Sequence, residues 1–280
     1  MMNWNQLISA KRFGMEEFHE ERQENRSEFQ RDYDRLIFSA PFRRLQNKTQ
    51  VFPLPGSVFV HNRLTHSLEV ASVGRSLGDD VAKALLERHP ELQDSFLPEI
   101  GSIVSAACLA HDLGNPPFGH SGEKAISTFF SEGKGVRLKE KQPNGEQLSP
   151  MEWEDLIHFE GNANAFRILT HQFEGRRKGG FVLTYTTLAS IVKYPFSSSL
   201  AGTKSKFGFF VSEEESFRKI ATELGLILLN EHPLKYARHP LVYLVEAADD
   251  ICYQMMDIED AYKLKILTTE ETKELLMAYF

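Results

Sequence analysis

The sequence predicts an all-α protein. Apolar residues recur at steps of three and four in several stretches, which is the spacing of a helix with one buried face. No strand-turn-strand rhythm is visible, and strands do not alternate with helices. There is also no internal repeat. We therefore expect helices layered around one core, with short irregular or β-hairpin insertions.

The first half of the chain contains four predicted helices. Residues 1–24 are expected to form an N-terminal arm, because the stretch 14–35 carries charges of both signs and few apolar positions. Ser27 and Gln30 have capping-box spacing and predict a helix start, and Ala40-Pro41 predicts its end. Prolines and a glycine favour a loop or short strands over 51–60. Further helices are expected over 65–86, 100–111 and 121–130.

The second half follows the same pattern, with two polar loops over 131–150 and 196–212. Ser212 and Glu215 form a second capping-box candidate, which predicts a helix through Leu229. The other helices are expected over 160–172, 184–194, 241–262 and 270–280.

Composition limits the classes of protein that the chain can belong to. Its 280 residues are 41% hydrophobic and 25% charged, and the net charge is −7. A wholly basic nucleic-acid surface is therefore excluded, and an anionic ligand needs a local cluster of cations. Cys108 and Cys252 lie in apolar helical stretches, which is typical of core residues in a reducing compartment. No apolar run is long enough for a signal peptide or a membrane span, so we expect a cytoplasmic protein.

Polar residues interrupt the apolar stripes of three predicted helices. His66 heads one stripe, His111 continues a second with Asp112 beside it, and Asp249 interrupts a third. A buried ionised Asp is costly unless it is paired or coordinates a metal. Two imidazoles and two carboxylates are a plausible ligand set for one divalent transition metal.

Each of these residues also has a simpler interpretation. A single buried His is usually a hydrogen-bonded core residue, and Asp249 could form an ion pair with Arg238 or Lys193. The metal site is favoured because three separate helices each carry such a group. One of these helices runs directly into the Gly- and Pro-rich turn HDLGNPPFGH.

Six stretches of the chain resemble a known family in the same order. They are FRRLQNKTQVFPL at 42–54, HNRLTHSLEV at 61–70, HDLGNPPFGHSGE at 111–123, FEGNANAFRIL at 159–169, LASIVKYP at 188–195 and EAADDICY at 246–253. The family is the deoxyguanosine triphosphate triphosphohydrolase (dGTPase-like) group of the HD superfamily of metal-dependent phosphohydrolases. A lone His-Asp pair would be weak evidence, whereas six ordered stretches are specific.

The resemblance implies an all-α HD-domain fold and one divalent ion, which could be Mg, Mn, Ni, Co or Fe. It implies hydrolysis of dGTP or other deoxynucleoside triphosphates to a deoxynucleoside and inorganic tripolyphosphate. His66, His111, Asp112 and Asp249 would hold the metal. His120 would act as general acid, oriented by Glu123. The positions implied to contact substrate are Gln50, Arg63, Asn162, Lys193, Tyr194, Tyr253 and Asp257.

Within that set, Tyr253 and Asp257 would contact the sugar 3′-OH. Gln50 would disfavour a 2′-OH, while Arg63, Lys193 and Tyr194 would contact the phosphates. We interpret the neighbouring cations Arg43, Arg44 and Lys48 as a solvated or interface patch.

The chain is shorter than typical members of that family. We expect residues 25–280 to be the HD-type catalytic domain without the family's C-terminal region, which leaves base selectivity open. The resemblance also implies a homo-oligomer and a possible dNTP or single-stranded DNA effector. Two alternatives remain: an HD phosphohydrolase that acts on another nucleotide, and a non-catalytic module that binds nucleotide or single-stranded DNA.

Overall fold

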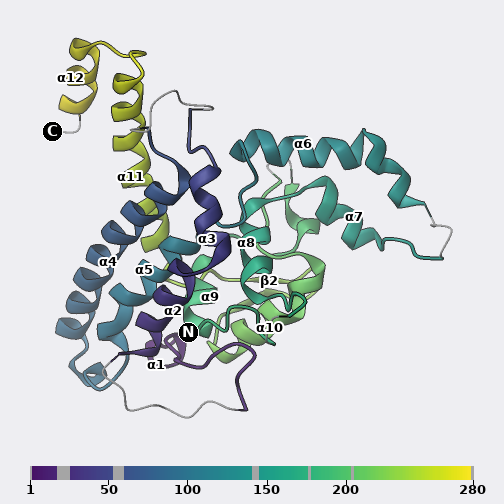
Figure 1. The fold of residues 1–280 in the computed structure, drawn as a ribbon. Helices are drawn as coiled ribbons and strands as arrows, with labels where there is room; N and C mark the ends of the chain where they lie inside the picture. The colour runs from purple at the N-terminus through teal and green to yellow at the C-terminus, as the bar shows by residue number, and fades with distance from the viewer. Residues whose placement is uncertain are drawn as a thin grey trace.

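A computed structural model describes residues 2–17, 26–52, 60–140, 145–175, 178–202 and 205–278. Helices dominate this part of the chain, and the strands β1 (Leu228–Asn230) and β2 (Lys235–Tyr236) form one short antiparallel pair (Figure 1). The all-α prediction is therefore confirmed. Most of the expected loop over 51–60 lies outside the described residues.

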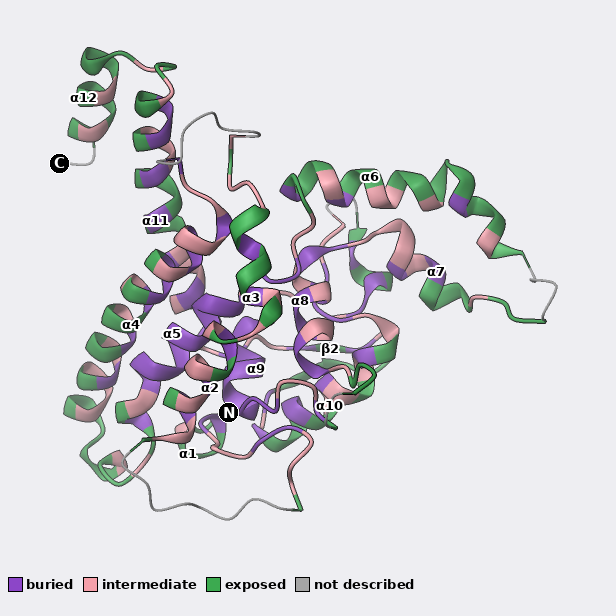
Figure 2. Ribbon diagram, in the orientation of Figure 1, coloured by how far each residue is buried: buried purple, intermediate pink, exposed green. Residues whose placement is uncertain are grey.

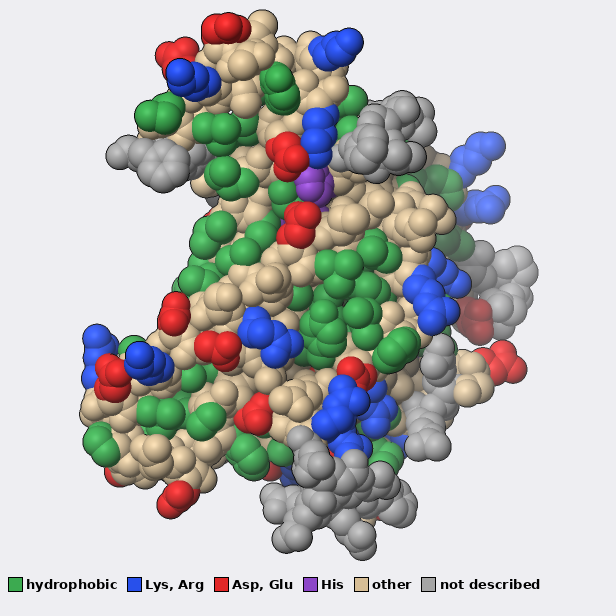
Figure 3. All heavy atoms as spheres, turned by 60° about the vertical axis from the view of Figure 1, so that its left-hand side comes forward, with side chains coloured by type: hydrophobic (Ala, Val, Ile, Leu, Met, Phe, Trp, Pro, Cys, Tyr) green, Lys and Arg blue, Asp and Glu red, His purple; other side chains and the backbone are tan. Residues whose placement is uncertain are grey.

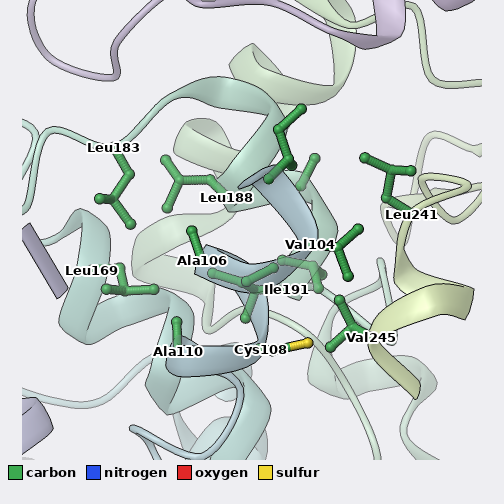
Figure 4. Packing of buried hydrophobic residues seen from close by; sticks show 14 of the residues in the cluster. Val104, Ala106, Cys108, Ala110, Leu169, Leu183, Leu188, Ile191, Leu241 and Val245 are labelled. Atoms are coloured by element: carbon green, nitrogen blue, oxygen red, sulfur yellow. The ribbon is translucent and has the colours of Figure 1, made fainter. Parts of the chain in front are cut away.

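The helix α5 (Ile100–Ala110) is the centre of the fold, and every one of its residues is buried. It is surrounded by α2 (Glu28–Ile37), α4 (Arg63–Arg88), α9 (Tyr185–Ile191) and α11 (Val242–Lys263). Figure 2 shows the resulting buried centre, and Figure 4 shows Val104 and Cys108 of α5 near Val245 of α11. The expected apolar stripe on α5 thus extends around the whole helix, because neighbours cover all of its sides.

Glycines allow α4 to lie unusually close to α5. A Cβ placed on Gly74 would come within 2.6 Å of the Cys108 Sγ and 3.5 Å of the Ala248 Cβ on α11. A Cβ on Gly78 would lie 2.7 Å from the Cα of Gly101. Three helices therefore meet at Gly74 with no room for a side chain.

The ends of the first helices follow local capping chemistry. The Ser27 side chain accepts a hydrogen bond from the backbone N–H of Gln30, as its spacing predicts. Asn62 and Thr65 form a reciprocal capping box at the start of α4. The helix expected to stop near Ala40-Pro41 ends at Ile37, and Pro41 lies in the first turn of the next helix, α3 (Ala40–Arg44). Proline fits that position because the first-turn N–H groups have no intrahelical acceptor.

The helix expected to run from Ser212 to Leu229 is shorter than predicted. It begins as α10 at Glu214 and ends at Glu223, and Ser212 does not cap it. Gly225 follows in the left-handed conformation, with φ of +65°. Its N–H bonds to Thr222, and the N–H of Leu226 bonds to Ala221. Glycine terminates a helix in this way, and the β1–β2 hairpin follows.

The remaining helices lie near the predicted positions, with additions. The helix α7 falls at the border of an expected loop, and α7, α1 and the short α3 have no counterpart among the predicted helices. The bounds are α1 (Trp4–Leu7), η1 (Leu45–Asn47), η2 (Pro90–Leu92), η3 (Leu97–Glu99), α6 (Gly119–Ser131), η4 (Lys134–Lys139), α7 (Pro150–Ile157), α8 (Gly161–Thr170), η5 (Ser198–Leu200), η7 (Val211–Glu213) and α12 (Thr269–Met277).

The described part of the N-terminal segment packs against the core. Leu7 and Ile8 are 2% and 3% exposed. The buried Arg12 pairs with Asp32 at 2.8 Å and donates to the backbone carbonyl of Val182 at 2.6 Å. Residues 18–25, which include the expected boundary between arm and catalytic domain, lie outside the described residues.

The side of the molecule formed by α4, α11 and α12 carries apolar patches between charged residues (Figure 3). On α11 and α12 the exposed apolar side chains include Met255, Tyr262 and Met277. Within the described residues, no helix combines the length and the apolarity needed to cross a membrane. Cys108 and Cys252 are both buried free thiols.

Candidate functional site

The polar residues on the inner faces of α4 and α11 meet at the end of α5. One ligand atom from each of His66, His111 and Asp112 lies within 4.8 Å of the other two. Asp249 Oδ1 lies 2.9 Å from His66 Nε2 and 3.6 Å from His111 Nε2. The structure thus brings together all four residues expected to hold a metal.

One ring nitrogen of His111 is available toward this cluster. His111 Nδ1 donates to the backbone carbonyl of Cys108 at 2.6 Å, so its proton is fixed on that nitrogen. The buried His111 Nε2 has no hydrogen-bond partner within the described residues. A ring held by a carbonyl on one nitrogen and open at the other is the usual arrangement of a metal-bound His. The donor set therefore fits a divalent cation.

The electrostatics of the cluster favour positive charge. Burial alone would lower the pKa of His111, but Asp112 and Asp249 outweigh burial and raise it to about 9. Burial would raise the pKa of Asp249, yet His111 and His66 hold it well below its usual range. Arg63 Nη1 also lies 2.6 Å from Asp112 Oδ2, and both residues are buried. Two carboxylates in a small buried volume thus attract every nearby cation.

The turn after Asp112 is strained and closely packed. Phe118 and Gly119 both have left-handed backbone conformations, with φ of 66° and 53°. Such a conformation costs free energy for Phe and persists only where the surroundings enforce it. A Cβ on Gly119 would lie 2.7 Å from Arg63 Nη2, so this glycine leaves room for the guanidinium. The turn starts α6 with His120 in its first turn.

His120 and Glu123 form a directed pair on α6. The Nδ1–H of His120 donates to Glu123 Oε2 at 2.7 Å, because a carboxylate oxygen can only accept. The His120 side chain is 85% exposed, whereas that of Glu123 is 11% exposed. Glu123 Oε1 accepts from the backbone N–H of Gly161 at 2.8 Å. The carboxylate is therefore fixed by α8, and it fixes the imidazole in turn.

Two further glycines allow the turn and α8 to touch. A Cβ on Gly114 would lie 2.0 Å from the Gly161 carbonyl oxygen and 2.2 Å from the Ala165 nitrogen. A Cβ on Gly161 would lie 2.1 Å from Asn115 Oδ1. Asn115 in turn donates to Asp112 Oδ1. The position of Asp112 thus depends on backbone contact between two elements.

A cavity of about 480 Å³ opens beside the cluster. Its volume is in the range of small-molecule sites. Most of the residues predicted from the sequence line it: Gln50, Arg63, His111, Asp112, His120, Glu123, Asn162, Lys193, Tyr194, Asp249 and Tyr253. His66 is not part of the lining and is 1% exposed.

Several of the lining side chains are held by carboxylates. Lys193 Nζ lies 2.9 Å from Glu246 Oε1, and Arg238 pairs with the other oxygen of Glu246 at 3.0 Å. Asp249 is therefore paired with the histidines, and neither Arg238 nor Lys193 is its partner. The buried Oε1 of Gln50 has no hydrogen-bond partner within the described residues.

Asp257 lies one helical turn beyond Tyr253 on α11 and does not line the cavity. Its carboxylate raises the pKa of the Tyr253 hydroxyl. The two residues are thus neighbours, but only Tyr253 reaches the cavity wall.

Among the polar lining residues that the sequence did not identify are Glu160 and Lys206. Glu160 is 1% exposed, and it accepts from Lys206 Nζ and the Asn162 side chain, both at 2.8 Å. Lys206 also lies 3.8 Å from Glu123 Oε2. Glu160 is the N-cap of α8, a position that Ser, Thr, Asp or Asn usually occupies, so no capping signal in the stretch FEGNAN indicates it. Lys206 lies in an irregular loop, where no periodic pattern of apolar residues indicates which way its side chain points.

Comparison with known proteins places the cluster in a recognised domain. The HD domain family matches residues 63–177, which include His66, His111 and Asp112. A deoxyguanosinetriphosphate triphosphohydrolase-like protein of Pseudomonas aeruginosa is 46% identical over 99% of this chain. The chain thus contains an HD domain and is similar over nearly its whole length to a deoxyguanosinetriphosphate triphosphohydrolase-like protein.

Other relatives are also similar over most of the chain. A relative with the same name from Synechocystis sp. is 45% identical over 95% of it. A deoxyguanosinetriphosphate triphosphohydrolase of Yersinia enterocolitica is 36% identical over 96% of it. The chain spans 61% of the length of the Pseudomonas and Synechocystis relatives and 57% of the Yersinia relative.

Proposed function

We propose that this chain is the catalytic part of a metal-dependent phosphohydrolase. Its substrate would be a deoxynucleoside triphosphate, dGTP among them, and its products a deoxynucleoside and inorganic tripolyphosphate. The observation that carries the proposal is one cavity that joins a His/Asp cluster, a His-Glu pair and two lysines. The names of the relatives agree with this reaction.

The charge of the cavity supports a bound cation. Its lining contains three Lys and Arg side chains and five carboxylates, a net charge of −1 when His111, with its pKa of about 9, is counted as positive and His120 as neutral. A triphosphate carries about four negative charges, and such a lining alone would repel it. A divalent ion at His66, His111, Asp112 and Asp249 would neutralise the excess. The Nε2 of His111, which has no hydrogen-bond partner in the described part of the chain, supports the same conclusion.

When bound, a divalent ion supplies a Lewis acid and lowers the pKa of water from about 15.7 to about 7. Mg, Mn, Ni, Co and Fe are all compatible with mixed imidazole and carboxylate ligands. Other residues of the chain orient the side chains that would hold the ion. Asn115 and Arg63 orient Asp112, and the Cys108 carbonyl fixes the tautomer of His111.

His120 is the proposed general acid. Glu123 holds its Nδ1–H, so the second ring nitrogen, Nε2, is left to carry a proton into the cavity. Water attacks the α-phosphorus, the bond between that phosphorus and the 5′-oxygen breaks, and His120 protonates the departing 5′-oxygen. Water thus gives its oxygen to the tripolyphosphate and its protons to the medium and to His120. Positioned acid–base catalysis contributes about 10²–10⁴ in rate.

The remaining lining residues would recognise the substrate. Lys193, Tyr194 and Lys206 face the cavity and would contact the phosphates. Arg63 also faces it, but its guanidinium is already paired with Asp112, so it would act on the phosphates with only part of its donors. Asn162 is held by Glu160 on the same wall.

The sugar would lie beside Gln50 and Tyr253, which both line the cavity. Gln50, whose side-chain oxygen has no hydrogen-bond partner among the described residues, would face the sugar edge and disfavour a 2′-OH. Tyr253 would contact the 3′-OH, with Asp257 acting beside it.

The test is product analysis with each of the four deoxynucleoside triphosphates, alone and mixed, and with Mg²⁺ or Mn²⁺. Tripolyphosphate is the expected product, whereas orthophosphate or pyrophosphate would indicate another HD phosphohydrolase. His120→Ala should lower turnover by about 10²–10⁴ while metal binding persists. His89→Ala, at an exposed His on another element, is the matched control. Turnover by His120→Ala at the parent rate would contradict the assignment.

The proposal also covers the extent of the catalytic domain, the cellular compartment, the oligomeric state and an effector. We expect residues 25–280 to act as the catalytic domain of a cytoplasmic protein, and the buried free cysteines agree with a reducing compartment. The exposed apolar side chains of α11 and α12 would lie in contacts of a homo-oligomer. A dNTP or single-stranded DNA effector is also expected. Light scattering of the purified chain tests the oligomer directly.

A further inference from the structure

Glu160 is a buried carboxylate in the wall of the cavity beside the metal cluster, and the proposed reaction assigns no step to it. The residue is 1% exposed, yet it lines the cavity. An ionised carboxylate is almost never fully buried unless a cation pairs with it. The cation here is Lys206, whose Nζ lies 2.8 Å from Glu160 Oε1. A buried ion pair thus lies in the cavity proposed to receive a polyphosphate.

The two oxygens of Glu160 have different partners. Oε2 accepts hydrogen bonds from the backbone N–H groups of Asn162, at 2.6 Å, and Ala163, at 3.3 Å, in the first turn of α8. Oε1 accepts from Lys206 Nζ and from Asn162 Nδ2, both at 2.8 Å. Ser, Thr, Asp and Asn are the usual residues at a helix start, and their shorter side chains are sufficient for a cap. Capping therefore does not explain a Glu at this position, whereas the ion pair with Lys206 does.

Lys206 is held between two carboxylates that line the cavity. Its Nζ lies 2.8 Å from Glu160 Oε1 and 3.8 Å from Glu123 Oε2. Burial would lower the pKa of Lys206, but the charge of Glu160 outweighs burial and raises it. The backbone is held separately, because the neighbouring Phe207 is fully buried in an apolar cluster with Ala163. Glu160 thus determines the position of the ammonium group rather than the path of the chain.

A polyphosphate that enters the cavity has to compete with Glu160 for Lys206. An ammonium group that is paired with a carboxylate has little charge left to attract a phosphate. If a phosphate takes Lys206, Glu160 stays buried without its cation and faces a polyanion, and both effects cost free energy. The cavity should therefore hold phosphates more weakly than the number of cations in its lining suggests.

We propose that Glu160 is a positioning residue that acts through Lys206 and limits how tightly the cavity holds a polyphosphate product. Release of product is a slow step in many enzymes, and a polyanion next to a metal ion and free lysines would leave slowly. Glu160 takes Lys206 back as the product departs, which favours release. The inference rests on the proposed function for the identity of the product, tripolyphosphate.

Isothermal titration calorimetry with inorganic tripolyphosphate in excess Mg²⁺ tests the proposal. Glu160→Gln keeps the size of the side chain and an acceptor oxygen but removes the charge, and it should bind tripolyphosphate about tenfold more tightly than the parent. Glu160→Ser places a preferred residue at the start of α8 and should also bind more tightly. Glu213→Gln is the matched control, because Glu213 is 2% exposed and pairs with Arg167 at 2.6 Å outside the cavity. It should bind like the parent.

A second background tests whether Glu160 acts through Lys206. Lys206→Met should weaken tripolyphosphate binding about tenfold, and in this background Glu160→Gln should gain less than about twofold, because no lysine is left to release. A residue that only caps α8 would not tighten binding when it is replaced. The proposal is overturned if the folded neutral variants bind tripolyphosphate no more tightly than the parent, or if the full gain persists without Lys206.

Turnover separates this inference from the proposed reaction. In hydrolysis of dGTP, Glu160→Gln should lower KM and strengthen inhibition by added tripolyphosphate, and a raised KM would contradict the role of Glu160. If the parent hydrolyses no deoxynucleoside triphosphate, the proposed reaction fails. The calorimetric comparison still decides the role of Glu160 in that case, because it requires no turnover.

Discussion

Replacing Arg63 by Met should destabilise the metal-free chain strongly. The Arg63 Nη1 lies 2.6 Å from Asp112 Oδ2, and these residues are 7% and 6% exposed. Removing one partner of a buried ion pair costs about 3–5 kcal/mol, because the other charge stays buried without compensation. His111 is beside the same carboxylate and carries positive charge when its pKa is about 9. We therefore expect the lower end of the range, about 3 kcal/mol.

Urea unfolding followed by circular dichroism at pH 7.5 with EDTA measures this loss. For a protein of this size, 3 kcal/mol corresponds to a fall in Tm of about 6–12 °C. Arg43→Met, at an exposed position on α3, is the control and should change stability by less than about 0.5 kcal/mol. Mn²⁺ should restore part of the loss in Arg63→Met, since it would compensate Asp112. A loss below 1 kcal/mol in EDTA would refute the reasoning.

Three further predictions concern the metal, the turn and pH. Mn²⁺ at one hundred times its Kd should stabilise the parent by about 2.7 kcal/mol, and thermal shift assays should find this gain lost in Asp249→Asn. Gly114→Ala should cost about 1–3 kcal/mol or more and weaken Mn²⁺ binding, because its methyl group would meet backbone atoms of α8; unchanged metal affinity would argue against contact with α8 as the support of Asp112. Burial lowers the pKa of His239 to about 4, from 6.5. As pH falls from 6.5 to 4, His239 becomes protonated in the unfolded chain but stays neutral in the folded chain. The free energy of unfolding therefore decreases over that window, relative to its value above pH 6.5. Between pH 7 and 4.5 the parent should lose about 2 kcal/mol more than His239→Gln in urea titrations, and parallel pH profiles would contradict this.

The parts of the fold that can be predicted from the sequence are those that local periodicity determines. The helices α4, α5 and α11 each carry a long apolar stripe, and a stripe indicates which face turns inward. The sequence alone therefore assigns His66, His111 and Asp249 to inner faces. The structure adds their common meeting point, which depends on how three helices pack.

Other features have no local signal. The strands β1 and β2 contain three and two residues, too few for an alternating pattern to be visible. Pro41 suggests the end of a helix, but a proline is equally compatible with the first turn of the next one. Lys206 enters the site from an irregular loop, and only tertiary packing against Glu160 determines its direction.

Because Gly74 has no side chain, α4 packs closely on α5, and this packing affects the position of His66 on the same helix. Gly74 and His66 are eight residues apart on α4, a distance of about 12 Å along the helix axis. Metal–ligand distances must hold within about 0.2 Å, whereas a methyl group at Gly74 would have to move the sulfur of Cys108 or tilt α4 away from α5. Because a helix is rigid over two turns, a tilt of α4 at Gly74 displaces His66. The geometry of the cluster formed by His66, His111, Asp112 and Asp249 thus depends on packing at Gly74, two turns away. We expect substitutions between α4 and α5 to alter metal affinity without touching any of these four residues.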